Sequence, residues 1–305
     1  MFAATALISY TSDMLRGLVV IALLGGCSDH RPVAPPPPAK DPLDVVLGSP
    51  GVPPRRELRY APAKGASSSL EIALDVDLGA GEMGGAMPTV VLDLDLAITD
   101  VAPDGRIAVR ATITDASARD RAEAKVPAAS VADQVAKLKG AAFVLALAPD
   151  GKVAEQTIEA GARPLPSAMQ QQLAALASSF ANLAMRLPHD PVGVGATWTS
   201  ARTIQQAGMI TTATTSVELT KLDGTKLSFT TTTRITGKDQ TVTPQPGAPS
   251  IDVSNITGSG SASGVVDLAT LATTGAVSLE LHADMTNGAE KTPMVMTMKQ
   301  TVTAR

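Results

Sequence analysis

Strict alternation of apolar and polar residues is the feature that most limits how this chain can fold. From Leu70 to Leu78, every second residue is leucine, isoleucine or valine, with acidic residues and alanine between them. The pattern returns from Val90 to Thr99 and from Arg106 to Thr114. Successive side chains of a β-strand point to opposite faces of a sheet, so each segment predicts a strand with one buried face. The chain is therefore expected to be mainly β.

Turn sequences predict how the strands follow one another. Asp104-Gly105 is a two-residue loop of the kind that joins antiparallel strands, and Ala-Pro-Asp-Gly returns at Ala148 to Gly151. In the later part of the chain, Asp223-Gly224 and Thr274-Gly275 are predicted to turn two further hairpins. The order of hairpins in the first half is thus repeated, at a nearly constant offset, in the second. We interpret this as an internal duplication.

A long amphipathic helix is predicted between the two halves. Ser167 and Gln170 fit a capping box at its start, and Pro188 ends it. Its apolar residues recur at spacings of three and four, which places them in one stripe: Met169, Leu173, Leu176, Phe180, Leu183 and Leu187. The stripe is short for a coiled coil, so packing on the protein's own sheet is favoured. A shorter helix is predicted from Ser130 to Lys139.

These elements predict an α+β fold, mainly β with α. We expect two similar antiparallel curved sheets, each resembling half a barrel, with the long helix between them. Residues 55–187 would form the first β-rich half with its helices, and residues 188–305 the second. Aromatic residues make up only 2% of the chain, so the core must consist of aliphatic residues and methionine.

The N-terminal segment has the form of an export signal. Arg16 is followed by a short apolar run from Leu18 to Leu24, then by Gly25-Gly26 and by Cys27, the only cysteine of the chain. The run is too short to span a bilayer, which needs about 20 residues. Leu24 to Cys27 resembles the cleavage box of bacterial lipoproteins. The resemblance implies that residues 1–26 are removed and that Cys27 is acylated.

The same resemblance implies a location. In bacterial lipoproteins, an aspartate directly after the acylated cysteine is typical of inner-membrane retention, and Ser28 stands there instead. We expect a lipid-anchored protein of the outer membrane, facing the periplasm or the outside. Met14 offers an alternative start that gives a compact signal. Residues 27–54 are dense in proline, with a run at Pro35 to Pro38, and predict an extended tether.

A second resemblance covers the junction between the two halves. Pro191 to Trp198 is similar to a Pro-Val-x-x-Gly-x-x-Trp junction in uncharacterised β-rich bacterial lipoproteins, and it implies no known activity. Glycines allow a tight entry into the following strand, and Trp198 is expected to fill a core with few other rings. In outline, the predicted fold is also similar to periplasmic lipid-carrier lipoproteins, which hold an acyl chain against a curved sheet.

Composition and motifs argue against several classes of function. A net charge of −4 leaves no basic footprint for nucleic acid. Gly79 to Gly84 matches a dinucleotide fingerprint, but Pro88 and a strand follow it where a helix should begin. Neither Gly-x-Ser-x-Gly nor Ser-x-x-Lys occurs, so no activated serine is recognisable. We expect a protein that is not an enzyme and has no cofactor.

Two groups of charged residues allow a metal site or a salt-bridged surface, and we favour the surface for both. The first is a set of carboxylates that could hold calcium, or whose charge Arg106 and Arg110 could offset: Glu71, Asp75, Asp77, Asp93 and Asp95. The second alternates along one strand face: Glu280, His282 and Asp284. No metal is therefore expected.

Methionines alternate near the C-terminus at Met294, Met296 and Met298. Thioethers at this spacing could bind Cu(I), could fill gaps in the core or, with Met285 and Met209, could line a soft apolar cavity. We expect a non-enzymatic envelope lipoprotein that binds an apolar ligand or lipidated partner through these candidates: Leu176, Phe180, Met285, Met294, Met296 and Met298. The alternative is a structural or interaction protein of the envelope, with a filled core and contacts through its threonine-rich strand faces.

Overall fold

The computed structural model describes residues 45–79, 84–159, 184–206, 209–243, 250–287 and 290–305. Its one described helix is α2, Ala129–Ala136. Its strands are β1 Val46–Ser49, β2 Ser67–Gly79, β3 Gly85–Ala86, β4 Thr89–Val101, β5 Ile107–Arg119, β6 Ala142–Leu147, β7 Val153–Glu159, β8 Thr197–Gln206, β9 Met209–Asp223, β10 Lys226–Gly237, β11 Gln240–Val242, β12 Ile251–Asp267, β13 Thr273–Asn287 and β14 Glu290–Ala304.

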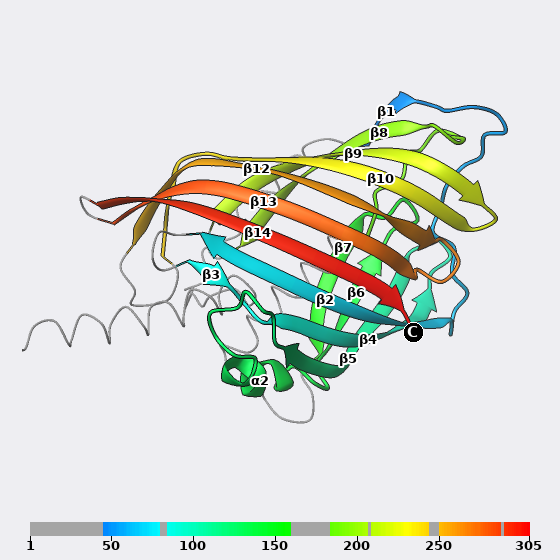
Figure 1. Cartoon of the computed structure of the whole chain (residues 1–305). Coiled ribbons are helices and arrows are strands. Elements are labelled where there is room, and N and C mark those ends of the chain that lie inside the picture. Colours follow the sequence, from blue (N-terminus) through cyan, green and yellow to red (C-terminus); the bar gives the residue numbers. More distant parts are fainter. Residues whose placement is uncertain (1–44, 80–83, 160–183, 207–208, 244–249, 288–289) are drawn as a thin grey trace, which may run out of the picture.

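All of these strands belong to one antiparallel sheet. Its order is β1-β8-β9-β10-β12-β13-β14-β2-β4-β5-β6-β7, with β3 on β2 and β11 on β12. Figure 1 shows the sheet curling, so that β8 near one edge and β7 at the other both lie behind the long middle strands. The sheet therefore has a convex face, toward the viewer in Figure 1, and a concave face that carries the buried side chains.

The predicted α+β fold class is wrong, because the described chain is almost entirely β, with one short helix. The two halves form one sheet rather than two, because β14 at the end of the chain pairs with β2 from Val295–Gly79 to Ala304–Leu70. Apolar and polar residues alternate along both strands, and each strand offers an unpaired backbone edge. Unpaired strand edges favour pairing with one another. The long helix predicted between the halves falls largely on residues 160–183, outside the described residues, and residues 184–187 at its predicted end are not helical.

Local predictions fare better than long-range ones. The three alternating segments form β2, β4 and β5, and the short predicted helix forms α2. Gly105 and Gly151 turn the β4–β5 and β6–β7 connections with φ of 83° and 85°, a region open to glycine. The predicted two-residue loop at Asp104-Gly105 is wrong, because residues 102–106 form the connection between Val101 and Ile107. The predicted turn at Thr274-Gly275 is wrong, because Gly275 lies inside β13 opposite Gly264. That connection is made instead around Leu271, which itself has a positive φ.

Two clusters of buried residues lie on the concave face, toward opposite ends of the strands. We call the first the closed end; its largest fully buried side chains include Trp198, Phe143, Leu58, Leu94 and Leu227. We call the second the methionine end; its buried members are Ala213, Ile235, Val242, Ile251, Val253, Ile256, Leu281 and Ala283. In Figure 1 the closed end is at the right, near the β12–β13 turn, and the methionine end is at the left.

Residues 50–62 cross the closed end and tie distant parts of the sheet together. Arg56 and Val192 exchange two backbone hydrogen bonds of 3.0 and 2.9 Å, which connects this segment to the Pro191–Trp198 junction. Further on, Tyr60 N donates to Pro149 O, and Ala61 N donates to Leu268 O. The preceding residues 46–49, within the predicted tether, form β1 on the edge of β8. This crossing segment explains why one end of the curved sheet is covered.

Trp198 fills the closed end as the sequence predicts. Its side chain is 1% exposed, and its indole Nε1 donates a 2.8 Å hydrogen bond to the carbonyl of Arg186. The Arg186 guanidinium in turn pairs with Asp150 at 3.1 Å. The Tyr60 hydroxyl donates to the carbonyl of Met185 at 3.2 Å, and burial raises the pKa of this phenol. A large ring with a satisfied polar atom thus anchors the junction.

Candidate functional site

The structure brings four predicted methionines together on the concave face. Met294, Met296 and Met298 alternate along β14 on the same face as buried Val302, and all three are half-buried. Their partners on β13 are Ala283, Leu281 and Leu279. Met285 continues this surface on β13, opposite Val253. Leu176, Phe180 and the acylation candidate Cys27 lie outside the described residues.

Exposure along this face is uneven: Val76, Leu281 and Ala283 are buried, whereas several other side chains toward the methionine end are only half-buried. On β2, Leu70 and Ile72 are 3% and 5% exposed, whereas Leu74 and Leu78 are half-buried. On β14, Val302 is 4% exposed, whereas the methionines toward the other end are half-buried. A core filled evenly along the strands would bury all of these positions. The methionine end therefore presents apolar side chains that the described chain only partly covers.

The floor of the concave face is lined by small residues. β12 contributes Gly258, Gly260, Ala262 and Gly264 to the same face as buried Val266. A β-carbon on Gly260 would lie 2.9 Å from Cδ1 of Leu279, and one on Gly258 would lie 3.1 Å from Cδ1 of Leu281. The two leucines thus lean over the glycines. Any larger residue on β12 would push the leucines into the concave space.

Sequence reasoning missed the polar side chains on this face. Thr215 on β9 and Thr233 on β10 join their hydroxyl groups at 3.0 Å. Arg202 on β8 pairs with buried Ala213, on the same face as Trp198. Burial lowers the pKa of the Arg202 guanidinium, although the side chain keeps solvent-exposed surface. The sequence does indicate that Arg202 shares a face with Trp198. Every second residue of a strand lies on one face, and here these residues are Trp198, Ser200, Arg202 and Ile204.

The acidic residues lie on the convex face, and all of them are joined to arginines except Asp95, which accepts a hydrogen bond from Ser69. Arg305, the last residue, pairs with Glu71 and, at 2.7 Å, with Asp93, which ties β14 to β2 and β4. The hydrogen bond from Arg305 is the main cause that holds the pKa of Glu71 below its usual value. Arg121 pairs with Asp77 at 2.9 Å. The carboxylates therefore converge on guanidinium groups rather than on a common ion position.

The arginines predicted to offset these carboxylates are the wrong ones. Arg106 pairs with Asp104 at 2.8 Å, within its own turn. Arg110 pairs with Glu159 on β7 at 2.6 Å. Both arginines follow Asp104-Gly105 in sequence, but neither reaches β2, because β4 lies between β2 and β5. Strand order, which the alternation does not give, decides which charges meet.

The second candidate metal group separates, because Asp284 does not join Glu280 and His282. His282 Nε2 lies 2.5 Å from Glu280 Oε1 on the convex face of β13. Asp284 instead accepts hydrogen bonds from Asn255 at 2.6 Å and Lys291 at 3.0 Å. Within the described ranges, no group of three or more histidine, cysteine, aspartate or glutamate side chains is placed to hold a metal ion.

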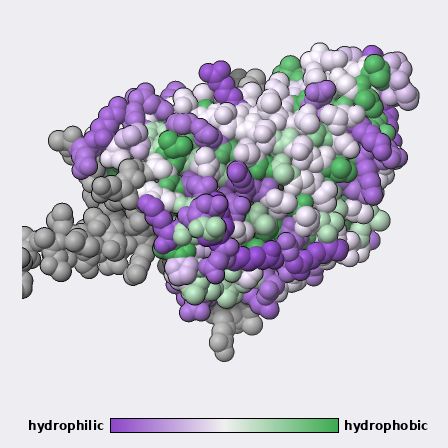
Figure 2. Space-filling view, in the orientation of Figure 1, coloured by the Kyte–Doolittle hydropathy of each residue, from purple (hydrophilic) through white to green (hydrophobic). Residues whose placement is uncertain are grey.

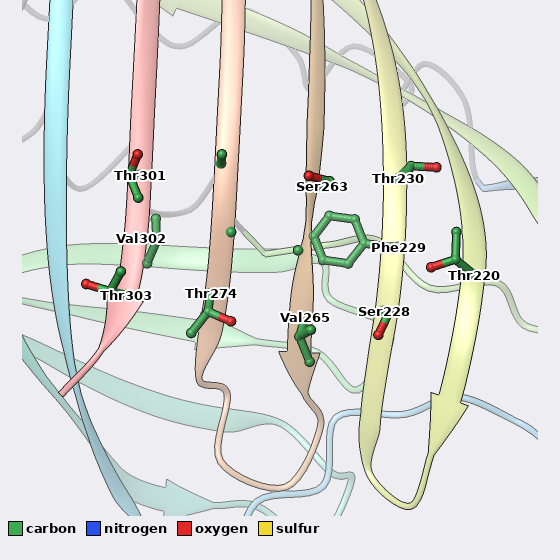
Figure 3. Close-up of a pocket in the computed structure, with 13 residues that line it drawn as sticks. Thr220, Ser228, Phe229, Thr230, Ser263, Val265, Thr274, Thr301, Val302 and Thr303 are labelled. Carbon is green, nitrogen blue, oxygen red and sulfur yellow. The ribbon is translucent and has the colours of Figure 1, made fainter.

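Hydroxyl side chains line a shallow depression on the convex face, near the closed end. Figure 3 shows threonines and serines of neighbouring strands around it, with the ring of Phe229 extending toward β12. Gly264 and Gly275 pair across β12 and β13 at this position. Figure 2 shows a mostly pale, weakly polar surface over the middle strands of this face. The lining residues are Thr220, Ser228, Phe229, Thr230, Ser263, Gly264, Val265, Thr274, Gly275, Ala276, Thr301, Val302 and Thr303.

Comparison with protein-family models and with curated proteins found no match to this chain. Across the part of the chain that the structure describes, no helix is both long and apolar enough to cross a membrane. The site must therefore be interpreted from its own chemistry. Two surfaces are candidate binding sites. One is the half-buried apolar surface of the concave face, and the other is the hydroxyl-lined depression of the convex face.

Proposed function

We propose that the protein is a lipid-anchored lipoprotein of the bacterial outer membrane that binds an apolar ligand on its concave face and catalyses no reaction. The observation that carries the proposal is the contiguous set of half-buried side chains at the methionine end: Leu78, Leu279, Met285, Met294, Met296 and Met298. Covering apolar surface contributes roughly 25 cal/mol per Å², so an acyl chain laid on this set would be held by burial alone.

The residue types at the methionine end suit a ligand of variable shape. Methionine is unbranched and polarizable, so it adapts to irregular apolar partners. Ligand sites are mostly apolar with a few placed polar groups, and Thr215 and Thr233 supply such groups beside the glycine floor. The lipoprotein resemblance at Cys27 supports an anchor upstream of the sheet, where an extended tether would let the concave face reach lipid or lipidated partners.

The convex depression favours a second candidate function, a structural or interaction protein of the envelope. Its threonine and serine hydroxyl groups can donate and accept hydrogen bonds to a polar partner. The depression is shallow and open, whereas the concave face offers a contiguous apolar surface. A ligand would remove more apolar surface from water on the concave face, which favours that face as the ligand site.

Native mass spectrometry of the full-length chain carrying Cys27→Ser tests the proposal, because this variant cannot be acylated. After gentle purification from a Gram-negative host, we expect a lipid-sized adduct. Met296→Arg on the concave face should abolish the adduct, whereas Thr301→Arg on the convex face of the same strand should retain it. A bare protein mass, even after incubation with phosphatidylethanolamine–phosphatidylglycerol vesicles, would overturn the proposal.

The anchor is tested separately by the mass of the protein extracted from membranes. We expect the wild-type protein to partition into detergent and to carry acyl groups on Cys27, as a bacterial lipoprotein does. Cys27→Ser should appear in the aqueous phase without them. Equal partitioning of the two proteins would contradict the anchor while leaving the concave face open to the first test.

A further inference from the structure

Exposed valines gather where the crossing segment meets the junction before β8. We call residues 46–56 and 192–199, which run side by side here, the rim. Val52 and Val194 are 61% and 39% exposed, and Val52 N donates a 2.9 Å hydrogen bond to Val194 O. Val46, in β1, is 54% exposed. Three of the five exposed large apolar side chains among the described residues therefore belong to the rim.

Two glycines bring the backbones of the rim into direct contact. A β-carbon on Gly193 would overlap the carbonyl oxygen of Val52, and one on Gly51 would overlap the carbonyl oxygen of Gly193. No side chain fits between two backbones that lie this close, so Val52 and Val194 lie on the outside. They add little to the buried core there. Neighbouring exposed apolar side chains indicate a surface that a partner covers.

The only charged residues of the rim are two adjacent arginines, Arg55 and Arg56. Arg55 donates from Nε and Nη2 to the carbonyl of Gly51 at 2.9 and 2.7 Å, which holds its guanidinium against the turn that carries Val52. Arg56 donates to a carbonyl of the β9–β10 turn. Neither arginine forms an ion pair with a described carboxylate, since Glu57 lies 3.9 Å from Arg59 instead. The exposed valines therefore stand beside uncompensated positive charge.

Charges that border the rim do not reverse its sign. The adjoining chain and the β9–β10 hairpin carry three cations and three anions, which cancel: Arg59, Lys221, Lys226, Glu57, Asp190 and Asp223. The rim thus keeps the charge of its two arginines, although the whole chain has a net charge of −4. Exposed apolar side chains next to basic residues match a surface with apolar and anionic groups, such as the headgroup region of an anionic membrane.

We propose that the rim rests on an anionic phospholipid bilayer, the membrane in which Cys27 is anchored. The inference rests on the proposed function, because that function supplies the anchor. Residues 28–44 lie between Cys27 and the start of the described fold, and a segment of this length spans at most about 60 Å. The rim is the part of the described fold nearest to the anchor along the chain. A short tether gives an effective concentration of about 1 mM or more, so a weak contact suffices.

This contact fixes the direction in which the concave face opens. Figure 2 shows apolar surface at the upper right, where Figure 1 places β1 and the segment that follows it. The methionine end lies at the opposite end of the strands. With the rim on the bilayer, the methionine end points away from the membrane. It would then receive its apolar ligand from a partner in the aqueous space rather than from the bilayer beneath it.

Quenching of tryptophan fluorescence by brominated phospholipids tests the contact in the acylated, full-length protein. Val52→Trp places a probe on the rim. Ile210→Trp is the matched control, because Ile210 is 52% exposed and lies on the convex face at the start of β9, away from the rim. In brominated vesicles that contain phosphatidylglycerol, the Val52→Trp variant should lose most of its added emission. The control should keep its added emission, and buried Trp198 gives both variants the same background.

The charge is tested by adding Arg55→Gln and Arg56→Gln to the Val52→Trp variant. Each cation near an anionic membrane contributes about fivefold to the binding constant, so loss of both should weaken the contact roughly 25-fold and restore emission. High salt should have the same effect. Arg234→Gln, which removes an exposed arginine from the convex face of β10, is the control and should leave the quenching unchanged.

The outcomes separate this inference from the function beneath it. Protein that floats with the vesicles but is not quenched at position 52, or is quenched equally at position 210, would overturn the docking of the rim. A change in emission that follows protein density rather than bromination would mean that a second copy covers the rim, which also overturns the proposal. If the wild-type protein does not float with vesicles, the anchor itself is wrong.

Discussion

At the closed end, β2 and β14 bury Leu70, Ile72 and Val302 to 3–5% exposure, whereas at the methionine end the same two strands leave Leu78 and Met294 half-buried. The register between the strands is unbroken along this length, so backbone pairing does not explain the difference. What differs is the chain segment that lies over each end of the concave face. Residues 50–62 and the junction around Trp198 lie across the closed end. One alternating pattern can therefore build both a core and an accessible surface.

The largest effect is expected from Trp198→Ala at the closed end. The ring is fully buried and its Nε1 satisfies the Arg186 carbonyl, so its removal should cost about 3 to 5 kcal/mol of unfolding free energy. Urea denaturation followed by circular dichroism measures this. Met298→Ala at the methionine end is the comparison and should cost markedly less, because Met298 is half-buried. Equal losses would mean that both ends are packed alike.

Gly260→Val on the concave floor should act next in size. The new β-carbon would lie 2.9 Å from Cδ1 of Leu279 and 2.8 Å from the carbonyl oxygen of Ser278, and overpacking typically costs about 1 to 3 kcal/mol. Because Leu279 would be pushed into the concave space, binding of Nile red, a neutral apolar dye, should fall even where the variant is fully folded. Ser261→Val, the neighbouring residue on the convex face, should leave dye binding unchanged.

The difference between the two ends could be predicted from the sequence only in part. Alternation gave β2, β4 and β5, and the spacing of Met294, Met296 and Met298 put them on one face, because both depend on neighbours within a single strand. The pairing of β14 with β2 joins residues far apart in the chain, and alternation alone does not choose between free edges. The prediction of two separate sheets was wrong because it did not include the pairing of β14 with β2.

Arg202 illustrates a second limit of sequence reasoning. Its neighbours Trp198 and Ile204 show which face it occupies, yet only the pairing of β8 with β9 shows that it lies opposite buried Ala213. The prediction of which arginines pair with the acidic residues was wrong for the same reason. Arg106 and Arg110 lie close to Asp93 along the chain, but neither pairs with it. Arg305 lies far from Asp93 along the chain and reaches it because β14 pairs with β2. Sites made by cross-strand neighbours need the strand order.

A smaller effect, again at the closed end, is expected from Tyr60→Phe. The variant keeps the buried ring and removes only the hydroxyl that donates to the Met185 carbonyl, which should cost about 1 kcal/mol. Urea denaturation measures the loss, and ligand binding at the methionine end should stay unchanged. A variant that unfolds normally but loses dye binding would show that the cover of the closed end also controls the other end.

The smallest effect concerns the convex seam that holds the two halves of the sheet in register. Arg305 holds the pKa of Glu71 below its unfolded value, so this pairing stabilises the fold above the unfolded pKa and is lost as the pH falls through the folded one. Arg305→Ala should therefore lower the urea midpoint slightly at neutral pH. The wild type and the variant should converge in acid, below the pKa of Glu71. The ion pairs are partly exposed, and salt should shrink the difference at neutral pH. A difference that persists in acid would show that Arg305 acts through packing on β14 rather than through its charge.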